Sequence, residues 1–268
     1  MHKNGYPVLR CRGCGTGHIE PSDFDPRTYY TRDYFEGGHC DGYADYGASA
    51  AVLRREFAAV ARRLARYAPA GGNLLEIGCA YGYFLEAAQG RWRVYGLEIS
   101  ADAVAHCQAS GLRDVRQGTA DHDALTDLPA LDAVVMLDVV EHLEDPAAVL
   151  EACFRKLRPG GVIYLSTGDF ASPLARIMRR HWRLMTPPQH IWYFTPHSFR
   201  QLAARFGAII ESVSHPGKAV PLSLIIFQLL RVLHMPDKAS TWVRGSSIGI
   251  PLNLFDAMHV VLRKPLQP

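Results

Sequence analysis

Short apolar segments alternate with amphipathic segments from about Ala48 onward, and this alternation constrains the fold most strongly. Residues 132–137 are nearly all apolar, as in a strand buried on both faces of a sheet. The pattern predicts further strands at 73–77, 93–98, 114–117, 162–166, 208–214 and 256–263, and helices at 49–67, 83–89, 100–110, 146–157 and 196–206. We therefore expect an α/β fold with a doubly wound, mainly parallel, seven-stranded sheet and helices on both faces.

Two stretches are too long to be simple connections between these elements. Residues 168–194 and 215–253 are expected to be insertions over the top of the sheet, where doubly wound folds bind ligands. Residues 1–47 differ from the rest, because they hold a Cys-x-x-Cys pair and many tyrosines. The sequence thus predicts an N-terminal extension at 1–47 and one domain at 48–268 with a lid built from the insertions.

Composition narrows the class of protein. Of the 268 residues 48% are apolar, the net charge is +3, and the isoelectric point of about 8.5 is milder than that of most nucleic-acid binders. The six cysteines are sparse, no apolar run is long enough to span a membrane, and Met1 to Val8 lacks the apolar core of a signal peptide. We expect a cytoplasmic protein without a nucleic-acid partner, and the sequence leaves its oligomeric state open.

A glycine-containing turn follows the first strand of the domain. Gly78 leaves the strand, Gly82 precedes the next helix, and Glu98 ends the following strand. Glycines at such a turn let backbone N–H groups approach a ligand, and an acid at that strand end can accept bonds from both hydroxyls of a ribose. The alternative is an ordinary strand-to-helix turn with an unrelated glutamate. The combination favours a nucleoside ligand.

Five ordered segments carry a family resemblance. Residues 76–82 resemble motif I of class I S-adenosylmethionine-dependent methyltransferases, Glu/Asp-x-Gly-x-Gly-x-Gly, with Ala80 in place of the middle glycine. Residues 97–100, 132–146, 157–163 and 262–265 are similar to later segments of the small-molecule branch of that family. The resemblance covers about 48–268. It implies a Rossmann-like fold, the cofactor S-adenosylmethionine and the product S-adenosylhomocysteine.

The resemblance also implies which residues hold the cofactor. They are Glu76, Gly78, Cys79, Ala80, Tyr81, Gly82, Tyr83 and Phe84 at the turn, Glu98, Ile99 and Ser100 after the second strand, Thr119, Ala120 and Asp121 near adenine, Leu137 and Asp138 beside the methionine part, and Tyr46. Alanine at position 80 is expected to cost little unless its φ is positive.

Three side chains are candidates for the base that an uncharged acceptor hydroxyl needs. Glu141 and His142 follow the fourth strand, near the methyl group in the family's architecture, and His190 lies in the first insertion within a Pro-x-x-His-x-x-Phe-Thr pattern of the small-molecule branch. The structural alternatives are a loop-holding residue for His142 and a packed histidine for His190. Glu141 and His142 alone are too few to indicate a metal, so we expect none.

The N-terminal extension offers two weaker signals. Cys11 and Cys14, followed by Gly15, form one zinc knuckle and resemble half of a zinc ribbon found ahead of some sugar C-methyltransferases. No other residues have a convincing spacing to complete four zinc ligands. The alternative is therefore a segment that binds no metal. Tyr34, Tyr43 and Tyr46 are candidates to close over the cofactor or substrate, and ordinary core packing explains them equally well.

The first insertion carries arginines at helical spacing. Arg176, Arg179, Arg180 and Arg183 would share one face of a helix over 173–183, and Pro221 to Pro236 is an apolar segment too short to span a membrane. A solvated face and a buried lid helix explain both features. The functional alternative is a lid for an anionic or lipid-like substrate, contacted by Arg179, Arg180 and Tyr193, with weak contact to a membrane surface.

The sequence thus predicts a methyltransferase that moves a methyl group to an oxygen or carbon of a small molecule. A sugar, a polyketide-like or quinone-like compound, and a lipid-linked intermediate are all compatible acceptors. The alternatives are an RNA methyltransferase, which the mild charge disfavours, and a non-catalytic protein that uses the cofactor fold to bind a partner.

Overall fold

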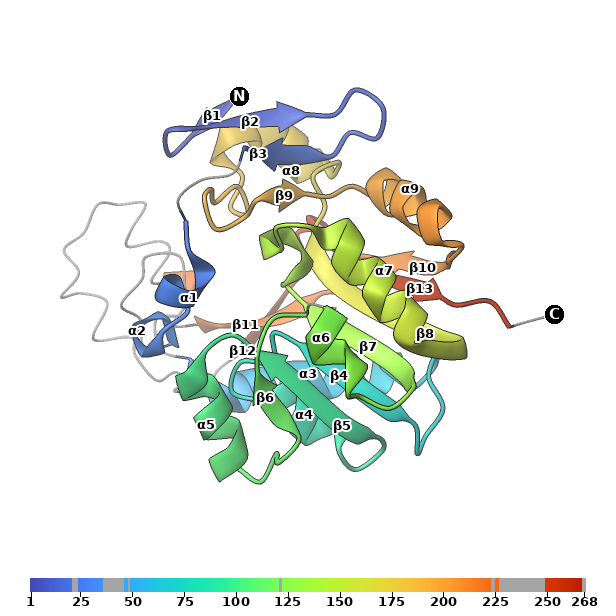
Figure 1. Ribbon diagram of the computed structural model, residues 1–268. Helices are drawn as coiled ribbons and strands as arrows, with labels where there is room; N and C mark the ends of the chain where they lie inside the picture. The colour runs from blue at the N-terminus through green and yellow to red at the C-terminus, as the bar shows by residue number, and fades with distance from the viewer. Residues whose placement is uncertain are drawn as a thin grey trace.

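The computed structural model describes residues 1–20, 24–35, 46–47, 49–120, 122–222, 225–226 and 249–266. Its centre is a seven-stranded sheet with the strand order β10, β13, β8, β7, β4, β5, β6 (Figure 1). These strands are β4 (Asn73–Ile77), β5 (Arg93–Glu98), β6 (Val115–Gln117), β7 (Leu131–Leu137), β8 (Leu157–Gly168), β10 (Ile209–Ser214) and β13 (Ala257–Arg263). Only β13 runs antiparallel to its neighbours within this sheet, which confirms the predicted doubly wound, mainly parallel arrangement.

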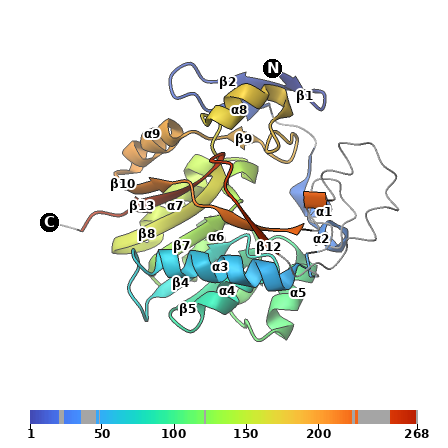
Figure 2. The ribbon, with the colours of Figure 1, turned by 180° about the vertical axis from the view of Figure 1, so that it is seen from behind.

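Helices cover both faces of the sheet, as expected. α3 (Ala50–Leu64), α4 (Tyr83–Ala88) and α5 (Ala101–Ala109) pack against one face, which is turned to the viewer in Figure 2. α6 (His122–Thr126), α7 (Pro146–Lys156) and α9 (Pro196–Phe206) pack against the other. Each layer buries its own apolar cluster, so the central strands are apolar on both sides.

Capping residues fix where the helices of the second layer begin. The Asp145 carboxylate accepts the Ala148 N–H at 2.9 Å, with Pro146 at the first helical position of α7. Thr195 and Ser198 exchange side-chain and backbone hydrogen bonds at the start of α9. These signals explain why the predicted helix starts agree with the structure.

The start of β8 differs from the sequence expectation. The Arg-Pro-Gly-Gly sequence at 158–161 predicts a turn, but β8 already begins at Leu157, which pairs with Leu131 ahead of an irregularity in the register. The Gly160 N–H donates to the Lys264 carbonyl and the Lys264 N–H donates to the Gly161 carbonyl, both at 2.9 Å. Gly160 has a φ of +81°, so the predicted turn is present within the assigned strand, and its backbone groups bond to the chain after β13.

The N-terminal residues and the first insertion share a second sheet. β1 (His2–Lys3), β2 (Tyr6–Arg10) and β3 (Gly17–Ile19) pair in that order, and β3 pairs with β9 (Trp192–Tyr193) of the insertion. Val8, Ile19, Trp182 and Tyr193 bury their side chains in one small core beneath this sheet. The sheet, at the top of Figure 1, holds the chain just after His190 in place.

The prediction of one arginine-bearing helix over 173–183 is wrong. α8 (Pro173–Met178) ends where Arg179 takes a φ of +49°, and a short 3-10 helix (Arg179–His181) follows. The four arginines therefore do not share one helical stripe, because the helix ends before Arg179, and Trp182 packs in the small core. Most of the apolar segment at 221–236 lies outside the described residues.

The second insertion contributes a hairpin of β11 (Lys218–Pro221) and β12 (Gly249–Leu252). The Ala219 N–H donates to the Glu56 carboxylate of α3 at 2.9 Å, which fixes the hairpin beside that helix. No helix in the part of the chain that the structure describes is long and apolar enough to cross a membrane.

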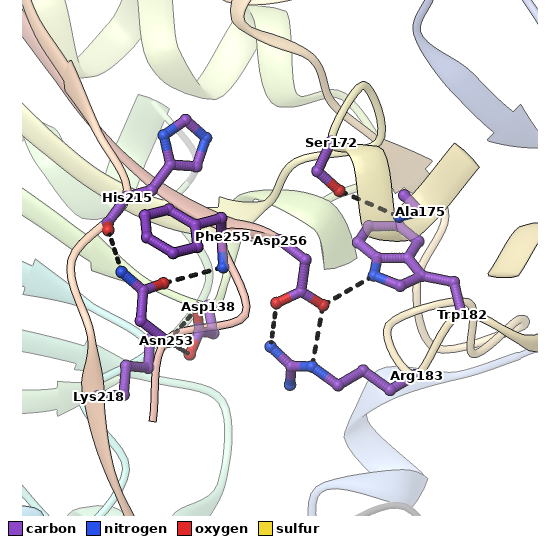
Figure 3. A network of polar contacts seen from close by, with 10 residues as sticks. All are labelled: Asp138, Ser172, Ala175, Trp182, Arg183, His215, Lys218, Asn253, Phe255 and Asp256. Carbon is purple, nitrogen blue, oxygen red and sulfur yellow. Dashed lines mark hydrogen bonds and ion pairs between the residues drawn. The ribbon is translucent and has the colours of Figure 1, made fainter. Parts of the chain in front are cut away.

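A buried carboxylate ties the first insertion to the sheet. Asp256, at the start of β13, accepts two hydrogen bonds from the Arg183 guanidinium at 2.9 and 3.0 Å and one from the Trp182 indole at 2.9 Å (Figure 3). The Asp256 side chain is 2% exposed and that of Arg183 is 43% exposed. A buried carboxylate needs these donors, because an unpaired buried charge is costly.

Replacing Arg183 with Met should therefore lower the free energy of unfolding by about 1–3 kcal/mol, since Asp256 keeps only the indole donor. Urea unfolding measures this change. Arg200→Met on the exposed face of α9 is the matched control and should shift stability by less than about 0.5 kcal/mol. Equal stability of the two variants would show that the hydrogen bonds between Arg183 and Asp256 do not stabilise the fold.

Candidate active site

A cavity of about 1580 Å³ opens at the carboxyl ends of the central strands. Residues after β4, β5, β7 and β8 line it, together with α1 (Pro26–Tyr29), α3 and the β11–β12 hairpin. This is the position at which doubly wound folds bind ligands. The two insertions and the N-terminal extension all contribute to its wall, as the predicted lid requires.

The glycines of the turn are required by its geometry. Gly78 has a φ of +70°, and a Cβ atom there would lie 2.5 Å from the Val139 side chain. Gly82 has a φ of +77°, and a Cβ atom there would overlap Leu112 and Cys107. The backbone from 78 to 82 can therefore run along the cavity wall only without side chains at both positions.

Alanine at position 80 has a positive φ, the conformation in which a non-glycine residue is strained. Its φ is +46°, so a non-glycine residue occupies the left-handed region at the centre of the turn. The Ala80 N–H donates to a Glu98 carboxylate oxygen at 2.7 Å, and the Cys107 thiol donates to the Ala80 carbonyl at 3.2 Å. These two bonds hold the strained residue in place.

Glu98 anchors the turn and faces the cavity. Besides the Ala80 N–H, it accepts the Ser100 N–H at 3.0 Å. The carboxyl group is 5% exposed, and this burial raises its pKa although the backbone donors oppose the shift. Each carboxylate oxygen keeps a second lone pair, so Glu98 can still accept hydroxyl groups from a ligand.

Glu76, on β4, carries an unused acceptor at the same wall. Within the described residues its Oε2 atom has no hydrogen-bond partner, and burial raises the pKa of this carboxyl group well above its ordinary value. An orphaned buried oxygen beside a cavity is a position for a polar ligand group.

Most of the other residues assigned to the cofactor by resemblance lie on the cavity. Those on its lining are Gly78, Cys79, Ala80, Phe84, Ile99, Thr119, Ala120, Leu137, Asp138 and Tyr46. Tyr81, Gly82, Tyr83 and Ser100 lie behind it, and the Tyr83 ring stacks on Tyr46 with centroids 5.4 Å apart. Asp121 and Tyr43 lie outside the described residues.

The three candidate bases come together on the opposite wall. One ligand-type atom from each of Glu141, His142 and His190 lies within 4.8 Å of the others, and the two imidazole rings meet edge to face with centroids 4.7 Å apart. The Ile191 N–H donates to the Glu141 carbonyl at 2.9 Å, which joins the first insertion to the segment after β7. The structure thus assembles one cluster from two distant segments.

Hydrogen bonds orient both imidazoles in the same way. His190 Nδ1 lies 2.8 Å from the Leu184 carbonyl and His142 Nδ1 lies 2.8 Å from the Gln189 carbonyl. Because a carbonyl oxygen only accepts, both Nδ1 atoms carry the proton and both Nε2 atoms carry a lone pair. Tyr30, whose hydroxyl lies 3.1 Å from His142 Nδ1, was not expected from the sequence.

Burial shifts the protonation of this cluster toward neutral forms. Burial, followed by the neighbouring His142, lowers the pKa of His190 to about 3. Burial, followed by the Asp138 charge, raises the pKa of Glu141 to about 8. At neutral pH the imidazoles are uncharged, and the carboxyl group of Glu141 is poised to exchange a proton.

A lysine and a third histidine complete the polar wall, and sequence patterns did not indicate them. Lys218 Nζ lies 2.8 and 3.2 Å from the two carboxylate oxygens of Asp138, a residue with a φ of +55° (Figure 3). The Asp138 side chain is half exposed, and the ammonium group holds the pKa of this carboxyl group below its usual range. His259, on β13, bonds the Tyr164 hydroxyl at 2.6 Å. Both belong to segments without a motif, and only the folded sheet brings them to the cavity.

The candidate substrate residues are divided between the cavity and its surroundings. Tyr34 lies on the cavity lining, whereas Arg179, Arg180 and Tyr193 do not. Cys11 and Cys14 occupy the turn between β2 and β3, and among the described residues they belong to no group of three potential metal ligands. Zinc at the knuckle therefore stays a hypothesis.

Comparison with known proteins assigns the family. Residues 50–213 match the family described as methyltransferase domain, so the chain belongs to that family. The match confirms the predicted resemblance to class I S-adenosylmethionine-dependent methyltransferases.

A solved magnesium protoporphyrin IX methyltransferase from Synechocystis with bound SAH has a TM-score of 0.56 and 15% identity, and the match covers 89% of this chain and 97% of that one. A methyltransferase from Archaeoglobus fulgidus gives a TM-score of 0.53 at 20% identity, over 79% of this chain and 94% of that one. Both likenesses confirm the fold.

Curated relatives share a shorter region. A probable S-adenosylmethionine-dependent methyltransferase of Mycolicibacterium smegmatis is 43% identical over 100 residues, which are 37% of this chain and 38% of that protein. The ubiquinone biosynthesis O-methyltransferase of Pseudomonas aeruginosa is 39% identical over 104 residues, 37% of this chain and 45% of that protein. The chain thus spans less than half the length of these relatives.

Replacing Ala80 with Gly should raise the free energy of unfolding by about 1 kcal/mol, because glycine adopts a positive φ without strain. Chemical denaturation measures the change. Ala88→Gly within α4 is the control and should lower stability, since φ is ordinary there. A loss of stability in the Ala80 variant would show that the turn is not strained.

Proposed function

We propose that this protein transfers a methyl group from S-adenosylmethionine to an oxygen or carbon atom of a small molecule. The observation that supports this proposal best is a single cavity whose one wall is the glycine turn with Glu98 and whose other wall is the Glu141, His142 and His190 cluster. A ligand that fills the first wall places its reactive end near the second.

The cofactor wall fits a nucleoside with an amino-acid tail. Glu98 would accept the ribose hydroxyls, and Ile99, Thr119 and Ala120 would surround the adenine. The glycine backbone and the orphaned Glu76 oxygen would face the amino-acid end. The sulfonium of the bound cofactor supplies an activated methyl group, and positioning and exclusion of water supply much of the rate.

The opposite wall would handle the acceptor. An acceptor hydroxyl loses its proton as the new bond to carbon forms, so a lone pair must lie within reach. His190 Nε2 offers such a lone pair, since Nδ1 donates to Leu184, and Glu141 stands beside it. Asp138 and Lys218 would fix polar groups of the acceptor at the junction of the two walls.

The acceptor is proposed to be a small molecule of the sugar, quinone-like or lipid-linked kind. The similarity to a ubiquinone biosynthesis O-methyltransferase favours a quinone-like acceptor that is methylated on oxygen. An anionic or lipid-like acceptor, a cytoplasmic location, and weak contact with a membrane surface remain parts of this proposal, but Arg179, Arg180 and Tyr193 lie off the cavity lining and are no longer proposed to contact the acceptor. RNA is the less favoured acceptor, because the net charge is only +3.

Replacing Glu98 with Ala should weaken binding of both S-adenosylmethionine and S-adenosylhomocysteine by about 1–3 kcal/mol through loss of charge-assisted hydrogen bonds. Calorimetric titration of each ligand measures the loss. Glu86→Ala on the outer side of α4 is the control and should bind both ligands as the wild type does. Unchanged affinity in the Glu98 variant would remove Glu98 from the ribose role.

Replacing His190 with Ala should lower kcat by about 10²–10⁴-fold while the affinity for S-adenosylhomocysteine stays within about twofold. The assay follows labelled methyl transfer to the best phenolic or hydroxyl acceptor found in a small-molecule screen. His197→Ala, an exposed histidine on α9, is the matched control. If the His190 variant retains most of its turnover, proton acceptance moves to Glu141 or His142.

A further inference from the structure

The cluster of Glu141, His142 and His190 has the donor set of a metal centre. Two imidazoles and one carboxylate are the protein ligands of several catalytic zinc sites, in which a fourth position stays open. A tetrahedral site with bonds of about 2.0–2.1 Å holds its ligand atoms roughly 3.3 Å apart. The three side chains already offer one ligand-type atom each within 4.8 Å of one another, and these atoms would have to move closer together around one ion.

The outer contacts of the two histidines are those of metal ligands. Metal-bound histidines commonly donate their second ring N–H to a backbone carbonyl, which fixes the tautomer and the ring direction. His142 and His190 both make this bond, to Gln189 and Leu184, and both leave Nε2 as the only nitrogen with a lone pair. Two independent imidazoles are therefore prepared in the tautomer that binds an ion.

The carboxylate supplies a separate indication of a missing ligand. Glu141 is 3% exposed, and within the described residues its Oε2 atom has no hydrogen-bond partner. A buried carboxylate oxygen without a donor is costly, and a cation beside it would remove that cost.

We infer that Glu141, His142 and His190 bind one divalent transition-metal ion, with zinc the ion that this donor set suits. All three residues lie on the cavity lining, so the fourth position faces the cavity and is left to an oxygen of water or of the acceptor. Ion binding does not depend on the proposed function. The catalytic consequence of ion binding does rest on the proposed function. In the metal-loaded protein the ion would lower the pKa of an acceptor hydroxyl, and a free imidazole would not be the base.

The test is titration of the chelator-treated, full-length protein with Co²⁺, followed by its visible absorption. The Cys11→Ser/Cys14→Ser double variant serves as the background, because the exposed Cys11 thiol and the half-buried Cys14 thiol could otherwise bind the ion. We expect one ion per chain in this background, bound equally well after His197→Ala. His190→Ala should weaken binding at least about tenfold. Glu141→Gln, which keeps the shape of the side chain, should do the same, and S-adenosylhomocysteine affinity checks that each variant is folded.

Two results would overturn the site. One is the absence of cobalt absorption in the background protein, and the other is equal affinity in the His190 and His197 variants. A chelator that abolishes methyl transfer without changing S-adenosylmethionine affinity would support the catalytic consequence, and unchanged turnover after complete metal removal would overturn it. Because cobalt binding is measured without the cofactor, failure of the metal site and failure of the proposed function give different results.

Discussion

The contact between Glu98 and the Ala80 N–H is the interaction on which the cavity depends. It is 2.7 Å long and joins the end of β5 to the centre of the turn after β4. The turn is left-handed at Gly78, Ala80 and Gly82, so without this acceptor a strained alanine would have no partner for its N–H. The same carboxylate faces the cavity, so the side chain that holds the turn is also the one proposed to bind the ribose of the cofactor.

The opposite wall depends on contacts between segments that are distant in the sequence. The strand pairing of β3 with β9 and the bond from Ile191 to Glu141 hold the first insertion against the segment after β7. His190 reaches His142 because of these contacts, and not because of any local signal. A cluster built from two separately anchored segments forms only in the folded protein.

Local sequence rules predicted the fold well where short-range physics decides it. β4 and β5 have their predicted limits, since apolar strands bounded by glycine turns leave few alternatives, and α7 and α9 start at their capping residues. The rules placed the start of β8 too late, because Leu157 already pairs with Leu131 before the turn at Gly160, and they failed at Arg179, where a positive φ ends the helix. The glycine turn was found because backbone geometry demands glycine. Lys218, His259 and the joining of His190 to Glu141 follow from tertiary contacts that no spacing in the sequence records.

The central claim is that the cavity holds S-adenosylmethionine. The most direct measurement is calorimetric titration of the unmodified protein with S-adenosylmethionine, repeated after saturation with S-adenosylhomocysteine and with NAD as a second nucleotide. The structure predicts one site per chain for S-adenosylmethionine, blocked by S-adenosylhomocysteine and indifferent to NAD, since Gly78 and Gly82 frame a turn for a single nucleoside with an amino-acid tail. Tight binding of NAD with no heat from S-adenosylmethionine would contradict the account.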